Sequence, residues 1–330
     1  MKQKAYARAG VDVDLGNRLK RRIQSLVRQT HGPQVLGEIG GFGGLFRAQF
    51  KGIRDPILVS SIDGVGTKLK IAFALDRHDT VGADLVNHCV NDIAVLGARP
   101  LFFLDYIGCE QLRPRVFDQL LRGFANACRA ADCALIGGET AQMPGIYRKG
   151  EYDLAGCIVG VVDRKKMIDG STIKPGDVVL GLPSNGLHTN GYSLARKILF
   201  EKMRLHPKLI GAELLRVHRN YQPLLAKVPN GMIKGLAHIT GGGLVDNLPR
   251  ILPKNCDAII ETKSWRVLRI FQILQRNGDV DLAEMYQVFN MVIGMVAIVS
   301  ERDAKRTMSI LKAKRIGRIK RGSGKTRLVF

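Results

Sequence analysis

One short stretch, residues 63–68, holds a carboxylate, two glycines, a hydroxyl and an ammonium: Asp63, Gly64, Gly66, Thr67 and Lys68. An apolar run at 56–59 precedes it and a second apolar run follows, which predicts a strand, a tight turn and a helix start. Backbone N–H groups at such a turn bind anions. A carboxylate tolerates phosphate beside it only when a cation lies between them. The stretch therefore predicts a metal–phosphate site, and hence a nucleotide, although Asp-Gly also marks ordinary turns.

The segment Asp84–Leu96 has the periodicity of a helix with one polar and one apolar face. Its polar stripe consists of Asp84, His88, Asn91 and Asp92. Two carboxylates on a partly buried helix could bind Mg²⁺, which prefers oxygen ligands. The alternative is a solvated helix face, with His88 at the surface and no ligand role.

Three glycine-containing blocks could bind phosphate groups. Gly137-Gly138-Glu139 follows an apolar strand pattern, and Glu139 could add a third carboxylate to the metal ligands or be a surface residue of a turn. His238 to Gly243 ends in three glycines, of which Gly241 and Gly242 would form an anion-binding nest. Ser184 to Ser193 contains His188 and Asn190 between a strand and a helix. His188 could be an acid/base or a phosphate ligand, or a structural loop histidine.

Strand-like and helix-like segments alternate along the chain, which predicts an α/β or α+β fold. The expected strands are 56–60, 101–107, 133–137, 154–162, 178–182, 257–261 and 291–300, and the expected helices are 84–96, 115–131, 209–228, 263–276 and 303–313. A charged, turn-rich stretch at 164–177 predicts two domains, 1–165 and 166–330. Gly40–Gly44 could be a loop that closes over a ligand, or a linker.

The chain has 330 residues and a formal net charge of +22, which is a common property of nucleic-acid-binding proteins. Aromatic residues do not alternate with the basic run at 312–327, so a stacking platform for nucleic acid is not expected. No apolar segment is long enough to span a membrane and no secretory signal is visible. The six cysteines lack zinc-ligand spacing, which favours free thiols in the cytoplasm. The sequence Gly322–Thr326 resembles a P-loop but has Ile319 where that motif needs glycine, so we expect a basic hairpin turn.

Taken in order, these blocks resemble the phosphoribosylformylglycinamidine cyclo-ligase (aminoimidazole ribonucleotide synthetase) family. The similarity covers essentially the whole chain and is carried by 6–12, 63–68, 89–92, 100–106, 137–145, 188–194, 238–243, 285–286 and 289–290. It implies an N-terminal domain that contributes strands to a barrel at a homodimer interface, and a C-terminal α/β domain. It also implies ATP-dependent closure of formylglycinamidine ribonucleotide to aminoimidazole ribonucleotide, with release of ADP and phosphate.

The resemblance implies a role for each block. Asp63, Asp92 and Glu139 would bind Mg²⁺, Lys68 would contact an ATP phosphate and His188 would act on the substrate side. The glycines at 64, 66, 137, 138, 241 and 242, together with Thr67 and Asn190, would bind the nucleotide and phosphate groups.

The chain departs from the family pattern in places. Asn87 and His88 stand where the family has small or apolar residues, so His88 gains no role from the resemblance, and Thr189 replaces a serine. Gln287, Val288 and Val292 replace Arg, Thr and Gly, which weakens any binding role for 287–293. The alternatives are another ATP-using enzyme of the same superfamily or a basic nucleic-acid-binding protein.

Overall fold

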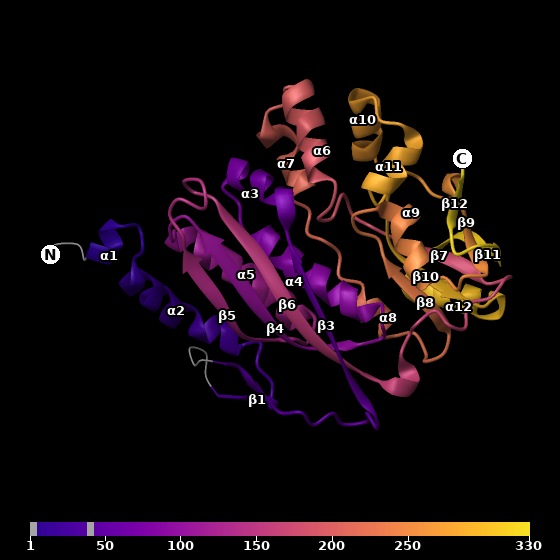
Figure 1. Cartoon of the computed structure of the whole chain (residues 1–330), viewed down its shortest axis with the longest axis horizontal. Helices are drawn as coiled ribbons and strands as arrows, with labels where there is room; N and C mark the ends of the chain where they lie inside the picture. The colour runs from indigo at the N-terminus through magenta and orange to yellow at the C-terminus, as the bar shows by residue number, and fades with distance from the viewer. Residues whose placement is uncertain (1–4, 38–42) are drawn as a thin grey trace.

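A computed structural model describes residues 5–37 and 43–330 as two mixed α/β domains that pack side by side (Figure 1). The predicted α/β class and the presence of two domains are confirmed. The glycine loop predicted at Gly40–Gly44 falls mainly on residues 38–42, which lie outside the described residues. Two short strands, β1 (Val35–Leu36) and β2 (Leu45–Phe46), flank it.

The N-terminal domain is built on a four-stranded sheet with the order β3-β6-β4-β5. Its strands are β3 (Pro56–Gly64), β4 (Arg99–Cys109), β5 (Ala134–Gln142) and β6 (Tyr152–Asp163). Only the β4–β5 pair is parallel. Helices α4 (Asp79–Ala94) and α5 (Pro114–Ala130) pack on one face, as the near-complete burial of α4 requires.

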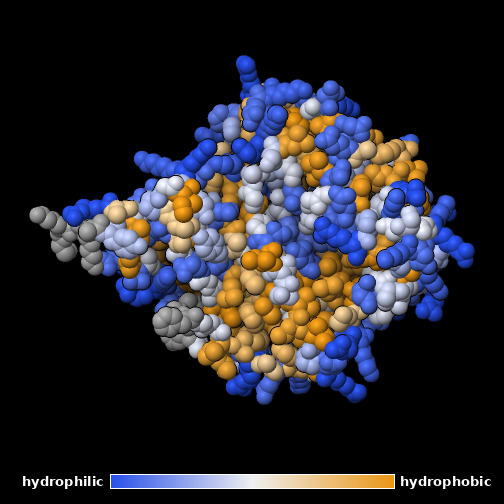
Figure 2. All heavy atoms as spheres, viewed as in Figure 1, coloured by the Kyte–Doolittle hydropathy of each residue, from blue (hydrophilic) through white to orange (hydrophobic). Residues whose placement is uncertain are grey.

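The opposite face of this sheet has little cover. Leu58 and Ile62 of β3 alternate with inward-facing residues and are exposed. Ile62 pairs across the sheet with Cys157, which pairs in turn with Leu104. The hydropathy view shows a broad apolar area over this part of the molecule (Figure 2). Apolar patches of this kind on a soluble protein mark interaction surfaces.

The C-terminal domain is built on a six-stranded sheet with the order β12-β9-β11-β7-β10-β8, in which only β9 and β12 are parallel. Its strands are β7 (Val178–Pro183), β8 (Ile233–His238), β9 (Cys256–Glu261), β10 (Ile293–Val299), β11 (Lys314–Arg321) and β12 (Thr326–Val329). The remaining helices are α1 (Ala5–Arg8), α2 (Val13–Arg28), α3 (Leu69–Leu75), α6 (Tyr192–Arg196), α7 (Pro207–Leu214), α8 (Gln222–Leu225), α9 (Gly243–Asn247), α10 (Arg269–Gly278), α11 (Leu282–Val288) and α12 (Glu301–Leu311).

The helix predicted over 209–228 is wrong. The structure has α7 and α8 there, joined by non-helical residues 215–221. Pro223 lies in the first turn of α8, where a missing N–H is tolerated; inside a continuous helix it would break one hydrogen bond and clash with the preceding turn. The non-helical segment runs along α4, and it becomes central to the site described below.

Two turns of the C-terminal domain differ from ordinary loops. Val292 precedes β10 with φ of +79°, a left-handed conformation that is unfavourable for a β-branched residue. The turn at Gly322–Lys325 encloses the carboxylate of Asp257, which accepts hydrogen bonds from the N–H groups of Ser323 and Lys325. The chain's own carboxylate thus occupies the position that a phosphate would take in a P-loop, which supports rejecting that motif.

Candidate active site

The polar face of α4 is buried between the two domains rather than solvated. It contacts segment 216–221 of the C-terminal domain through four hydrogen bonds of 2.6–2.9 Å: His218 N–H to Asp84 Oδ1, Asn87 Nδ2 to His218 O, Asn91 Nδ2 to Arg219 O, and Tyr221 N–H to Asn91 Oδ1. A buried backbone segment without regular structure needs such side-chain partners. The polar stripe therefore fixes the position of the C-terminal segment over the helix.

Lys68 lies within this interface and its side chain is 0% exposed. Its Nζ lies 2.7 Å from Asp84 Oδ2 and donates to the carbonyl oxygens of His188, at 3.0 Å, and Arg216, at 2.8 Å. An ammonium has three N–H groups, and each has an acceptor here. The predicted contact between Lys68 and an ATP phosphate stays a prediction, and its N–H groups already face acceptors within the protein. Lys68 instead joins the first turn of the N-terminal site to two loops of the C-terminal domain.

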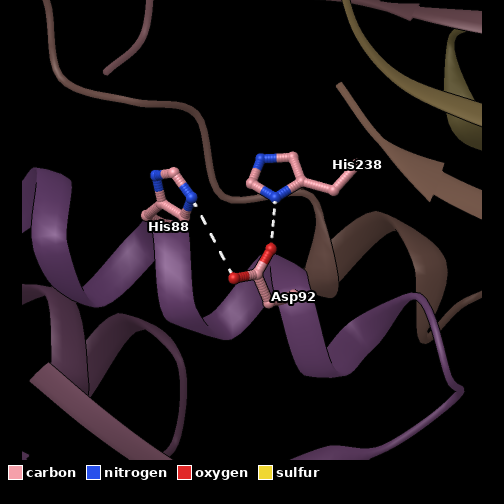
Figure 3. Close-up of side chains that lie close together, drawn as sticks. All are labelled: His88, Asp92 and His238. Atoms are coloured by element: carbon pink, nitrogen blue, oxygen red, sulfur yellow. Dashed lines mark hydrogen bonds and ion pairs between the residues drawn. The ribbon is translucent and has the colours of Figure 1, made fainter. Parts of the chain in front are cut away.

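A cluster of two carboxylates and two imidazoles lies at the other end of the α4 face, and Figure 3 shows one of the carboxylates, Asp92, with both imidazoles. His88 and Asp92 lie one turn apart on α4, and His238 reaches them from the end of β8. His238 Nδ1 lies 2.8 Å from Asp92 Oδ1, and His88 Nε2 lies 4.0 Å from Asp92 Oδ2 and 2.8 Å from Asp63 Oδ2. Both imidazoles are buried, whereas the side chains of Asp63 and Asp92 are 42% and 25% exposed. The cluster therefore opens to solvent through its carboxylates.

These residues belong to a continuous chain made of one ion-pair contact and four hydrogen bonds. The contact joins Asp63 Oδ2 to His88 Nε2 at 2.8 Å, and the hydrogen bonds continue through Thr189, His218 and His238 to Asp92, with lengths of 2.6, 3.2, 3.0 and 2.8 Å. The ionised carboxylates at its ends can only accept protons. Three neutral imidazoles and one hydroxyl supply four protons, enough for the four hydrogen bonds. The contact between His88 and Asp63 becomes a true ion pair only when the chain holds one additional proton.

The electrostatics place that proton on His88. Burial disfavours a charged His88, but its hydrogen bond with Asp63 and the charges of Asp92 and Asp63 outweigh burial and raise its pKa. Burial lowers the pKa of His238 despite its bond with Asp92. Burial and the neighbouring His188 hold the pKa of His218 well below the usual range. The pKa directions therefore favour His88 over His218 and His238 as the protonated imidazole, and its burial excludes the alternative of a surface histidine.

His188 lies beside the cluster but outside the hydrogen-bonded chain. Its ring stacks on His218 with 4.0 Å between centroids, and neither ring nitrogen has a hydrogen-bond partner among the described residues. Burial, followed by the effect of His238, holds its pKa well below the usual range. His188 is therefore a neutral, enclosed imidazole. Its predicted contact with substrate stays a prediction.

The structure does not bring Glu139 to the other predicted metal ligands. Asp63 lies on edge strand β3 and Glu139 on the opposite edge strand β5, three strand steps away. At about 4.8 Å per step the two backbones are about 14 Å apart, too far for one ion to bind both within this chain. Gly137 and Gly138 also lie within β5, paired with β4, so the predicted backbone nest there is not a loop.

The other predicted nucleotide-binding residues lie on neighbouring loops. Gly64 ends β3, and Gly66 and Thr67 lie in the short 3₁₀ turn that follows. Thr67 Oγ1 is 3.0 Å from the hydroxyl of Ser193, in the block that contains Asn190. The amide of Asn190 approaches Gly241, which directly precedes Gly242. The turn and the two C-terminal glycine blocks thus come together, as the sequence predicts, although no ligand contact follows from this.

His218 and His238 are the residues of the cluster that the sequence interpretation missed. His238 stands at the start of a block noted only for its glycines, and His218 was assigned to a helix interior. Pro223 was the available signal, because it ends any helix that would have placed His218 on a regular face. The six cysteines are free, as expected, and five of them are buried.

Comparisons with known proteins agree on the family. The family described as AIR synthase related protein, N-terminal domain, matches residues 52–162, and the corresponding C-terminal domain matches residues 174–329. Two curated relatives are both named phosphoribosylformylglycinamidine cyclo-ligase. The protein from Syntrophotalea carbinolica is 52% identical over 93% of this chain and 90% of its own length, and that from Geobacillus kaustophilus is 49% identical over 97% of both chains.

Solved structures share the fold at lower identity. The thiamine-monophosphate kinase from Stenotrophomonas maltophilia has a TM-score of 0.68 and 17% identity over 96% of both chains. The hydrogenase maturation protein HypE in complex with ATP has a TM-score of 0.68 and 19% identity, over 93% of this chain and 90% of that one. Within the described residues, 5–37 and 43–330, no helix has the length and apolar character needed to cross a membrane. The chain is an enzyme and belongs to the phosphoribosylformylglycinamidine cyclo-ligase family.

Proposed function

We propose that this enzyme closes the imidazole ring of formylglycinamidine ribonucleotide with ATP, forming 5-aminoimidazole ribonucleotide, ADP and phosphate in purine biosynthesis. The observation that carries the proposal is the junction of the 63–68 turn with the loops at 188–193 and 238–243. Each predicted block except that of Glu139 meets there. The names of relatives about 50% identical over nearly the whole chain support the same activity.

The chemistry explains why ATP is needed. The formyl amide carbonyl is a weak electrophile, and its oxygen is a poor leaving group. Transfer of the γ-phosphoryl group to that oxygen gives an iminophosphate, and the amidine nitrogen then attacks the carbon and expels phosphate. Phosphoryl transfer depends mainly on positioning and charge neutralisation. The protein therefore has to hold both phosphate and amide in place rather than provide a covalent nucleophile.

We assign the ATP-linked Mg²⁺ to the carboxylates of Asp63 and Asp92. Both are partly exposed at the opening of the cluster, and carboxylate oxygen suits Mg²⁺. The ion would neutralise phosphate charge when bound. Glu139 is left out of this assignment because of its place on β5. Lys68 is assigned to holding the 63–68 turn against the C-terminal domain.

The uncovered face of the N-terminal sheet supports a homodimer. Exposed Leu58 and Ile62 would be buried if two copies paired their sheets. A barrel formed across that interface would match the fold that the family resemblance implies. An Ile62→Lys variant should shift the mass measured by light scattering from dimer to monomer. A monomeric parent would contradict the dimer, and an unchanged dimer mass in the variant would contradict its formation through this face. We place the protein in the cytoplasm, which the six free thiols favour.

A coupled assay of ADP release tests the main proposal. Purified protein with MgATP should release ADP only when formylglycinamidine ribonucleotide is present, and aminoimidazole ribonucleotide should accumulate in equal amount. Thiamine monophosphate serves as the control substrate, because a structural neighbour is named as its kinase. ADP release with that control alone, or no release with formylglycinamidine ribonucleotide, would overturn the proposal.

A further inference from the structure

We propose that His88, His238 and Asp92 form a binding site for a divalent transition-metal ion of the Zn²⁺ and Co²⁺ class, with Asp63 at its open side. The inference goes beyond the proposed ring closure and does not depend on it. This ion and the ATP-linked Mg²⁺ would share the carboxylates of Asp63 and Asp92, so the site is tested without nucleotide. The donor set is the reason to separate this ion from Mg²⁺. Mg²⁺ keeps oxygen ligands, whereas paired imidazoles with a carboxylate suit zinc and its neighbours.

The distances fit such an ion. The three residues offer ligand atoms that lie within 4.8 Å of one another. Zinc bonds of 2.0–2.2 Å in a tetrahedral arrangement place ligand atoms about 3.4 Å apart. The two distances from Asp92 oxygens to the imidazoles, 2.8 Å to His238 and 4.0 Å to His88, lie on either side of that value. The two distances go to different oxygens of Asp92, so one carboxylate can face both imidazoles.

The second nitrogen of each imidazole is already held. His88 Nδ1 lies 2.6 Å from Thr189 Oγ1, and His238 Nε2 lies 3.0 Å from His218 Nε2. His218 Nδ1 in turn lies 3.2 Å from the same threonine hydroxyl. Thr189 and His218 together therefore orient the rings of His88 and His238. Outer hydrogen bonds of this kind fix the tautomer and ring direction of metal-binding histidines. The nitrogens left to face the ion are His88 Nε2 and His238 Nδ1.

The hydrogen-bond count also favours a cation at this point. Without one, and without an additional proton, one imidazole nitrogen must turn a bare lone pair toward a carboxylate 2.8 Å away, at Asp63 or at Asp92. With an ion on His88 Nε2 and His238 Nδ1, all three imidazoles can be neutral. His88 and His218 then donate to the Thr189 oxygen, and His238 donates to His218, so no bond between the rings lacks a proton. The partly exposed carboxylates of Asp63 and Asp92 give an ion access from solvent.

Cobalt spectroscopy on tag-free, chelator-treated protein without nucleotide tests the site. One Co²⁺ per chain should bind and produce the visible d–d absorption of a low-symmetry nitrogen–oxygen site. Zn²⁺ should remove this absorption, and excess Mg²⁺ should not. Absence of the absorption, or its loss to Mg²⁺, would overturn the inference. Ring closure in the ADP assay would still stand in that case, so the two proposals can fail separately.

Variants locate the ion. His88→Gln and His238→Gln should each weaken Co²⁺ binding by more than about 100-fold, and Thr189→Val by about 10- to 100-fold through loss of the outer hydroxyl. Thr189→Ser keeps that hydroxyl and should bind normally. His78→Gln is the matched control, because His78 is equally buried but lies outside the cluster and contacts Tyr152. Undiminished binding in both ligand variants would place the ion elsewhere.

X-ray absorption of the zinc-loaded parent protein tests the site without relying on the folding of any variant. The first shell should contain nitrogen and oxygen at about 2.0–2.2 Å, with the outer scattering of two imidazole rings. A shell of oxygen alone, without imidazole scattering, would overturn the inference.

Discussion

Asp84 and Asp92 lie two turns apart on the same face of α4, yet their surroundings have opposite consequences. Asp84 is fully buried and paired with Lys68, and its contacts link the two domains. Asp92 is partly exposed and bonded to imidazoles that can exchange protons or accept an ion. Position along one helix therefore separates a carboxylate that stabilises the interface from one that is available for chemistry. Solvent access and the type of partner decide the role, not the residue type.

Removal of the Lys68 ammonium should have the largest effect on stability. Lys68→Met leaves Asp84 buried without its cation, which should lower the free energy of unfolding by about 3–5 kcal/mol. Urea denaturation measures this. Lys70→Met is the control, because the Lys70–Glu151 pair is partly exposed and should contribute less than about 1 kcal/mol. Equal losses in the two variants would mean that burial does not distinguish these pairs.

Asp92→Asn should give the complementary result. The amide keeps the size of the side chain but not its charge, so the rate of ADP release should fall by about 100-fold while the free energy of unfolding changes by no more than about 1 kcal/mol. Asp79→Asn, an exposed change in the first turn of the same helix, should leave the rate unchanged. If Asp92→Asn instead unfolds the protein as readily as Lys68→Met does, the proposed division of roles fails.

Asp105 tests what burial does to a carboxylate without a cation. It lies on β4, and burial is the main cause that raises its pKa to about 7, with a smaller contribution from Glu139. Because the folded-state pKa lies above the unfolded value of 3.8, the folded state loses stability as pH rises from about 4 to about 7. Asp105→Asn should abolish that loss, which is on the order of 4 kcal/mol for a pKa that rises from 3.8 to about 7, so the variant should be more stable than the parent at pH 8 but not at pH 4. If melting curves give the same stability difference between variant and parent at pH 4 and at pH 8, this prediction is contradicted.

Arg315→Ala should have the smallest effect. Arg315 forms a two-bond ion pair with Glu301 at 2.8 and 2.9 Å, but both side chains are exposed. Water screens such a pair, so the free energy of unfolding should change by less than about 0.5–1 kcal/mol, and the change should shrink in high salt. A loss of several kcal/mol would show that short donor–acceptor distances stabilise an exposed ion pair as strongly as we expect only for a buried one.

The sequence predicts the elements better than it predicts their partners. Apolar periodicity places β3, α4 and α5 to within about five residues, because each buries an apolar face on its neighbour. The pattern does not show that the polar face of α4 is buried as well. Glycine-rich blocks correctly mark the loops around Thr67, Asn190 and Gly241. Lys68 shows what periodicity cannot supply, because its partner Asp84 is 16 positions away and its two carbonyl acceptors are more than 100.

The placement of Glu139 depends on the strand order, which the sequence does not show. Glu139 follows a strand and two glycines just as Asp63 follows its strand, so the sequence treats them alike. The sheet places them on opposite edges because β6 and β4 lie between β3 and β5. His218 was hidden in a helix prediction that Pro223 should have ended. No local pattern reveals which loop will cover α4.

The left-handed backbone at Val292 affects how many destabilising substitutions this protein can tolerate. A valine with φ of +79° holds conformational strain in the folded chain. Val292→Gly would release that strain but enlarge the freedom of the unfolded chain, leaving a gain of up to about 1 kcal/mol. The chain thus contains a reserve of stability that one substitution can release at a turn outside the histidine cluster, and melting curves of the variant would measure it. Such a reserve could offset a harmful substitution elsewhere and so widen the range of sequences this fold can accept.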